Sequence, residues 1–149
     1  MLYNYIDRYQ REVSPIPWKE LEHTADVGIE VWGHDLEQVF TESSSAMYGI
    51  MFAPPFFSGK GEDHEITLKG HDLQDLAVLW LNELLYLIEV RRRIYRVVSM
   101  FLDRQDFRLT AGGVLYPSPK VLTPLKAATF GGIFLDPSES SRLRLYFDA

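Results

Sequence analysis

The sequence of 149 residues predicts an α+β fold, in which a mixed or antiparallel β-sheet packs with two main α-helices in a single compact domain. Two stretches, at about residues 35–53 and 72–92, carry apolar residues at spacings of three and four, which is the helical period. From residue 94 onward, apolar and polar residues alternate between short turns, which is typical of neighbouring antiparallel strands. A hydrophobic content of 46% is sufficient for one continuous core.

Both predicted helices have recognisable start signals. Asp35 with Gln38 forms a capping-box-like start for the first helix, which stops before Pro54–Pro55. Asp72 caps the second helix, whose apolar stripe is wide enough to predict that this helix is largely buried. A narrow polar strip on the second helix faces either solvent or the wall of a site: Asn82, Tyr86 and Glu89, with Glu83 beside them.

The remaining elements are predicted strands. A strand from about Leu21 to Gly33 opens the domain, because its apolar residues alternate with polar or small ones. Five more strands are expected, at about residues 64–69, 94–103, 107–116, 122–135 and 142–148. Residues 1–20 show neither period and form an N-terminal arm before the domain of residues 21–149. We expect the tyrosines of the arm to pack on this domain.

The composition excludes several classes of function. The sequence has no cysteine, which excludes disulfides, thiolate metal sites and cysteine nucleophiles. A formal net charge of -6 argues against a protein that holds nucleic acid mainly by neutralising phosphates. Arg91, Arg92 and Arg93 close the second helix, and taken alone they are more typical of a solvated helix end than of an RNA-binding patch. No apolar run is long enough to span a bilayer and no cleavable signal is recognisable, so we expect a cytoplasmic protein.

Two acidic segments at opposite ends of the domain are candidate sites. Glu22, His23 and Asp26 place an imidazole and two carboxylates within five residues, and in a regular strand Glu22 and Asp26 share one face while His23 has the other. By pattern alone, Asp26 is a turn residue or, less often, a ligand. At the far end, Asp148 lies beside the terminal carboxylate of Ala149. Such hard oxygen donors suit Mg²⁺ or Ca²⁺, and a frayed tail is the alternative.

Four separated blocks of the sequence, in this order, resemble the archease family. They are Glu22-His23-Thr24-Ala25-Asp26-Val27-Gly28-Ile29, Trp80-Leu81-Asn82-Glu83-Leu84-Leu85-Tyr86, Lys126-Ala127-Ala128-Thr129-Phe130, and Phe147-Asp148 followed by one residue. The resemblance covers about Leu21 to Ala149, and four ordered blocks are much more specific than one short motif. The family pattern continues from the third block into a histidine, where this sequence has Gly131.

The resemblance implies a small α+β domain that acts as an accessory protein rather than as an enzyme. Its expected partner is the tRNA-splicing RNA ligase, which joins RNA ends bearing a 3′-phosphate or 2′,3′-cyclic phosphate in a GTP-dependent reaction. Archeases promote guanylylation of this ligase and keep it turning over. RNA is then an indirect partner, reached through the ligase.

The resemblance also implies which residues form the site. An acidic site for a divalent cation, Ca²⁺, Mg²⁺ or Mn²⁺, maps onto Asp26, Asp148 and the carboxylate of Ala149. Lys126 matches the family lysine implicated in activity. Glu22 and His23 stand in the first block and are candidate partner-contacting residues, with His23 expected first as a structural residue that orients its neighbours.

Two other functions stay open at this point. In a metal-dependent phosphohydrolase, Asp26 and Asp148 would hold the ion and His23 would act as general base. Release of phosphate by the purified protein alone would favour this function. A chaperone-like binding module without metal chemistry would instead use the tyrosine-rich arm, and it would lose its effect on a partner when residues 1–16 are deleted.

Overall fold

The computed structural model describes residues 16–22 and 26–149. In chain order its elements are β1 (Trp18–Glu22), β2 (Asp26–Gly33), α1 (Leu36–Met51), β3 (Glu62–Lys69), α2 (Leu73–Glu89), β4 (Arg93–Asp103), β5 (Arg108–Pro117), β6 (Ala127–Asp136) and β7 (Ser141–Asp148). The two predicted helices and the α+β fold class are therefore confirmed.

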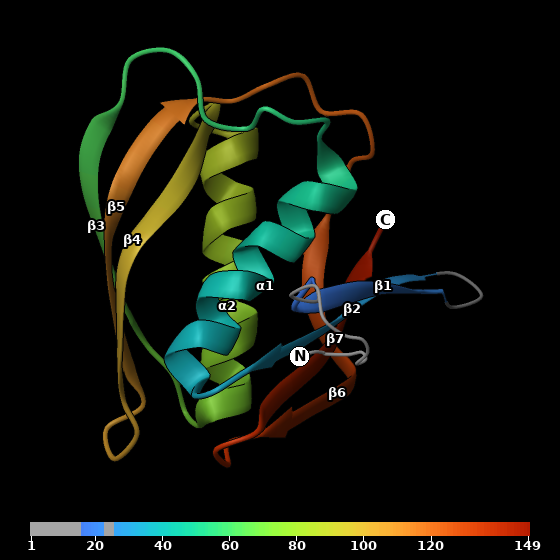
Figure 1. Cartoon of the computed structure of the whole chain (residues 1–149), viewed down its shortest axis with the longest axis vertical. Helices are drawn as coiled ribbons and strands as arrows, with labels where there is room; N and C mark the ends of the chain where they lie inside the picture. Colours follow the sequence, from blue (N-terminus) through green and yellow to red (C-terminus); the bar gives the residue numbers. More distant parts are fainter. Residues whose placement is uncertain (1–15, 23–25) are drawn as a thin grey trace.

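The strands form two sheets, and the two helices lie between them (Figure 1). One sheet has four strands in the order β1-β2-β7-β6, and the other has three in the order β3-β5-β4. Every pair of neighbouring strands is antiparallel. The last strand, β7, is an interior strand between β2 and β6, so the end of the described chain lies among segments from its beginning.

The helices begin at the predicted caps. The Asp35 carboxylate accepts a hydrogen bond from the Gln38 backbone N–H at 2.8 Å, and the Gln38 side chain accepts one from the His34 N–H at 2.7 Å. This pair resembles a capping box, except that the Gln38 side chain accepts from the residue before the cap and not from Asp35 itself. Asp72 accepts from the Asp75 N–H at 2.8 Å in the same way. The local sequence therefore fixes both helix starts.

Buried polar groups join the helices to each other and to the three-stranded sheet. The Trp80 indole of α2 donates to the Phe40 carbonyl of α1 at 2.9 Å. The Tyr48 hydroxyl of α1 donates to the Tyr95 carbonyl of β4 at 2.7 Å, and burial raises the pKa of Tyr48. All four residues are buried, so each hydrogen bond satisfies a group that has no access to water.

The prediction of one strand from Leu21 to Gly33 was wrong. The chain forms two antiparallel strands here, with Glu22 opposite Val27, so the inference that Glu22 and Asp26 share a strand face does not hold. Trp18 of β1 packs on α1, where a Cβ at Gly49 would lie 2.7 Å from the Trp18 ring. Residues 18–20, which were expected at the end of the arm, belong to β1. Residues 1–15, with the tyrosines of the arm, lie outside the described residues.

The strand expected over residues 122–135 begins later, at Ala127. It is preceded by an irregular segment, residues 118–126, which crosses one end of the helices between β5 and β6 and is called the strap below (Figure 1). Pro119 and Pro124 lack the N–H that a strand needs. Backbone hydrogen bonds hold the strap at several points instead, with Ser118 donating to Arg92 and with Leu122 and Thr123 donating to Met51.

Within the described part of the chain, no helix combines the length and the apolar character required to cross a membrane.

Candidate metal and partner site

The register of the four-stranded sheet places Asp26 and Asp148 directly opposite each other. Asp26 is the first residue of β2 and Asp148 is the last residue of β7. Directly opposed residues of an antiparallel pair project from the same face, with their Cβ atoms about 4.5–5.5 Å apart. The two carboxylates predicted from opposite ends of the domain therefore lie together, and with Ala149 they are called the acidic edge below.

The alternation of the two strands directs these carboxylates away from the helices. Ile29 and Val31 of β2 and Leu145 and Phe147 of β7 are fully buried in the core. Asp26 and Asp148 have the opposite parity, and Asp148 is exposed at the end of its strand. Burial of the apolar face thus sets the direction of the acidic side chains.

Tyr146 forms part of this outer face, although it was not among the predicted site residues. A Cβ at Gly28 would lie 2.6 Å from the Tyr146 ring, and one at Gly132 would lie 3.0 Å from it. The ring therefore lies over both glycines, beside the acidic edge. An isolated glycine in an alternating strand often marks such a close approach, and this was the available signal.

Lys126 lies at the same end of the sheet. Its backbone N–H donates to the Asp148 carbonyl at 2.8 Å, and the next residue, Ala127, pairs with Asp148 in the β6–β7 ladder. Lys126 is exposed and precedes the first residue of β6, so strand alternation does not fix its side chain. The ammonium group therefore has freedom to contact the acidic edge or a bound ligand.

Asn82 of α2 clamps the strand that follows Lys126. Its side-chain oxygen accepts from the Ala128 N–H at 2.7 Å, and its side-chain nitrogen donates to the Ala128 carbonyl at 3.2 Å. The polar strip predicted on this helix is therefore divided. Asn82 faces the four-stranded sheet, whereas Tyr86 faces solvent and is 49% exposed. Burial raises the pKa of Glu83, and the nearby His64 partly offsets that effect.

Several charges in the middle of this sheet contact one another or an aromatic ring. Glu30 lies between Lys19, at 3.7 Å, and Arg142, at 3.5 Å. The guanidinium groups of Arg142 and Arg144 lie 5.1 and 5.5 Å from the centre of the Phe134 ring. These contacts lie in the middle of the outer face, and Asp26 and Asp148 lie at its end.

The donor set of the acidic edge fits a hard divalent cation. Carboxylate oxygens are the ligands that Ca²⁺ and Mg²⁺ prefer. Residues 16–22 and 26–149 contain no group of three or more His, Cys, Asp or Glu side chains placed to hold a metal. Asp26 and Asp148 supply two of the donors that the family resemblance implies, and the Ala149 carboxylate is the predicted third.

The other predicted site residues have different outcomes. The backbone of Glu22 pairs with Val27 in the β1–β2 ladder. His23 lies outside the described residues. Gly131 stands where the family pattern has histidine, and a Cβ at this position would meet no atom within 4 Å. A larger side chain at Gly131 therefore has room.

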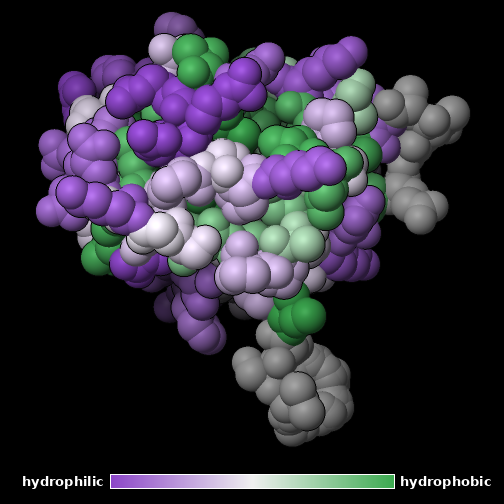
Figure 2. All heavy atoms as spheres, turned by 90° about the horizontal axis from the view of Figure 1, so that it is seen from above, coloured by the Kyte–Doolittle hydropathy of each residue, from purple (hydrophilic) through white to green (hydrophobic). Residues whose placement is uncertain are grey.

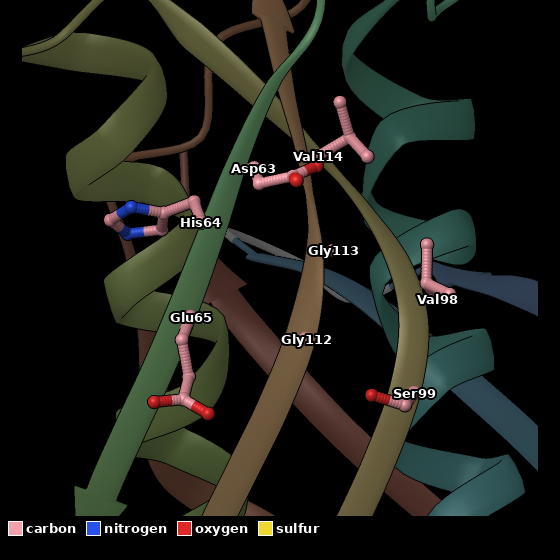
Figure 3. A pocket seen from close by; sticks show the side chains of 8 residues that line it. All are labelled: Asp63, His64, Glu65, Val98, Ser99, Gly112, Gly113 and Val114. Atoms are coloured by element: carbon pink, nitrogen blue, oxygen red, sulfur yellow. The ribbon is translucent and has the colours of Figure 1, made fainter.

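A second concave feature lies on the outer face of the three-stranded sheet. It is an open hollow of about 420 Å³ whose floor is formed by Gly112 and Gly113. Asp63 and Glu65 of β3 stand on one side of it and Ser99 of β4 on the other, whereas His64 points away toward α2 (Figure 3). None of the predicted site residues lines this hollow.

Comparison with known proteins gives one consistent family. The model of the Archease protein family (MTH1598/TM1083) matches residues 18–148. Protein archease of Methanosarcina mazei is 32% identical over 126 residues, which are 80% of this chain and 86% of that protein. Protein archease of Methanosarcina barkeri is 39% identical over 97 residues, which are 63% of this chain and 66% of that protein.

Two solved structures have the same fold. The solution structure of Methanobacterium thermoautotrophicum protein 1598 has a TM-score of 0.66 and 25% sequence identity, covering 91% of this chain and 100% of that one. The crystal structure of a Thermotoga maritima protein described as "an archease, possible chaperone" has a TM-score of 0.62, covering 88% of this chain and 96% of that one. At 18% identity, the second likeness concerns the fold alone.

The Asn82 clamp yields a stability prediction. Asn82→Ala leaves the N–H and the carbonyl of Ala128 without their partner, so we expect the free energy of unfolding to fall by about 2–3 kcal/mol. Urea denaturation followed by far-UV circular dichroism measures this loss. The matched control is Gln74→Ala, on an exposed position of the same helix, with an expected change within about 0.5 kcal/mol. Equal urea midpoints for the two variants would contradict the clamp.

Proposed function

Because the chain belongs to the archease family, we propose that it is an accessory protein of a tRNA-splicing RNA ligase, whose guanylylation and repeated turnover it promotes. In this proposal the ligase performs the chemistry on RNA, and this protein acts on the ligase. A divalent cation, Ca²⁺, Mg²⁺ or Mn²⁺, binds at the acidic edge. The observation that carries the proposal is the direct pairing of Asp26 with Asp148, the two positions that the family resemblance joins into one site.

The pairing has an energetic consequence that supports a cation site. Like charges directly opposite each other on antiparallel strands destabilise the pair. Burial of Phe147 and Ile29 fixes the register, so the Cα atoms of Asp26 and Asp148 stay opposite each other unless core residues move. A divalent cation bound there neutralises both carboxylates and offers open positions to oxygen ligands such as phosphate.

Lys126 contributes a positive charge beside this acidic edge. The hydrogen bond from its N–H to the Asp148 carbonyl keeps its backbone at the end of β7. In the proposal its ammonium group contacts a phosphate of the nucleotide in the ligase, or pairs with the acids when no partner is bound. The clamp between Asn82 and Ala128 supports this arrangement, since it fixes the start of β6 two residues from Lys126.

The cation site is tested by calorimetry on the purified protein. We expect Asp26→Asn and Asp148→Asn each to weaken divalent binding at least tenfold, or by about 1.4 kcal/mol, because each removes a carboxylate ligand. Titrations with Mg²⁺, Mn²⁺ and Ca²⁺ give the affinity. Asp63→Asn is the matched control, since it removes the same charge from the other sheet. Unchanged affinity in both acidic-edge variants would rule out this site.

The effect on the ligase is tested by guanylylation. Purified ligase with labelled GTP should form the guanylylated enzyme faster when this protein is added. We expect Asp148→Asn and Lys126→Ala to reduce that stimulation at least tenfold, because both act at the edge presented to the ligase. Asp63→Asn should keep it. If the two edge variants stimulate as well as the unmodified chain, the acidic edge is not the functional surface.

A further inference from the structure

One end of the molecule gathers cations that come from separate parts of the chain. It is the end where α2 finishes, β4 begins, β5 finishes and the strap crosses the helices (Figure 1). Its six basic residues are called the basic end: Lys60, Arg91, Arg92, Arg93, Arg96 and Lys120. The carboxylates of this region are fewer: Glu62, Asp63 and Glu89. The basic end therefore carries a net positive charge, although the net charge of the whole chain is -6.

Several contacts join these segments around the end of β5. The Ser118 N–H of the strap donates to the Arg92 carbonyl at 3.1 Å, and Arg93 pairs with Pro117 in the β4–β5 ladder. The Arg96 guanidinium lies 5.9 Å from the centre of the Tyr116 ring.

The loop that carries Lys60 reaches the same place. A Cβ at Gly59 would lie 3.5 Å from Pro117, and one at Gly61 would lie 2.5 Å from Val114. The segments that carry the cations thus meet at one end of the molecule, although they come from separate parts of the sequence.

Within residues 16–22 and 26–149, the cations of the basic end differ from several others in having no acidic partner. Ion pairs join Lys19 and Arg142 to Glu30, and Lys69 and Arg108 to Asp106. No residue of the basic end takes part in these pairs, and five of the six are exposed, Arg93 being half-buried. Unpaired and exposed cations are available to an external anion.

Arg92 adds a separate observation from the backbone. Its φ angle is +57°, in the left-handed region that glycine or asparagine usually occupies after a helix. The hydrogen bond from Ser118 to its carbonyl holds this conformation. A long cationic side chain thus stands at a position where glycine would be less strained.

We propose that the basic end binds the phosphate backbone of single-stranded RNA. Rows of cations are typical of surfaces that hold single strands without sequence preference. Arg96 is held there by its contact with the Tyr116 ring, which packs on Phe57. Figure 2 views this end and shows strongly hydrophilic side chains around a paler, partly hydrophobic area. Val90 and Leu122, which are 59% and 57% exposed, belong to the same end and offer apolar surface to bases.

The strap connects this surface to the acidic edge. It leaves the basic end at Ser118, carries Lys120, and reaches Asp148 through the backbone of Lys126 (Figure 1). RNA bound at the basic end would therefore be directed along Lys120 toward Lys126. The choice of RNA as the polyanion rests on the proposed function, because RNA ends are the substrate of the proposed partner ligase.

The test is fluorescence anisotropy with a labelled single-stranded RNA of about 20 nucleotides that bears a 3′-phosphate, titrated with the full chain at several salt concentrations. We expect the triple variant Arg92→Gln, Arg93→Gln, Lys120→Gln to weaken binding at least tenfold at low salt. The slope of log affinity against log salt should fall by about 2, since each lost phosphate contact contributes about 0.7 for single strands.

The matched control changes Lys69, Arg104 and Arg108 to glutamine, which alters the net charge equally at the opposite end of the three-stranded sheet. We expect this control to bind within about twofold of the unmodified chain. Equal losses in both triple variants, or no binding by the unmodified chain, would overturn the proposal. Displacement of the RNA by poly-glutamate at equal concentration would also overturn it, because the surface would then suit acidic proteins.

Two single-site variants test the role of Arg92 and the independence of the basic end from the acidic edge. Arg92→Gly should raise the melting temperature while weakening RNA binding several-fold, and a weakening that accompanies a lower melting temperature would contradict the role given to Arg92. Asp148→Asn should bind RNA no more weakly than the unmodified chain. Loss of ligase stimulation with retained RNA binding refutes the proposed function alone, whereas retained stimulation without RNA binding refutes only this inference.

Discussion

The antiparallel pairing of β7 with β2 is the constraint on which the rest of the site depends. It brings the last strand of the described chain into the interior of a sheet that begins with its first strands. The register is fixed by burial, because slipping β7 by one residue would turn Leu145 and Phe147 out of the core. A core that fixes the register therefore also keeps the backbones of Asp26 and Asp148 opposite each other, where a bound cation would relieve repulsion between their carboxylates.

Helix α2 in turn positions β6, the strand that pairs with the other side of β7. Asn82 projects from a helix whose opposite side is buried and apolar, and it holds Ala128 by both of its backbone groups. β6 then carries Ala127 into register with Asp148 and leaves Lys126 at the junction with the strap. The acidic edge thus lies at the ends of strands whose other face packs on the core. Ligands on loops would be held less rigidly.

The sequence predicted the elements that local rules determine. Helix caps at Asp35 and Asp72 and the alternation of the last strand are short-range signals, and all three are present as expected. The separation of β1 from β2 was missed, and the packing of Trp18 of β1 on Gly49 is a contact between distant positions that no local pattern displays. For the same reason, no local pattern could pair Asp26 with Asp148, and only the family resemblance linked them.

Other parts of the site depend on tertiary contacts that a sequence does not display. Asn82 was visible as a polar residue on an apolar helix, but its partner in β6 was not. Tyr146 alternates outward as expected, yet its place over Gly28 follows from the sheet register. The sequence alone suggested that the three arginines after α2 form a solvated helix end. In the folded chain Lys60, Arg96 and Lys120, which come from other segments, lie at the same end of the molecule.

Acidic and basic surfaces joined by the strap suit a protein that acts between a metal-dependent enzyme and its polyanionic substrate. Multiple-turnover ligation by the cognate ligase tests most directly whether this chain keeps an RNA ligase turning over. With substrate in large excess, we expect the product to exceed the ligase concentration many-fold only when this protein is present. Equal product with and without the protein, at matched ligase, GTP and metal concentrations, would contradict this role.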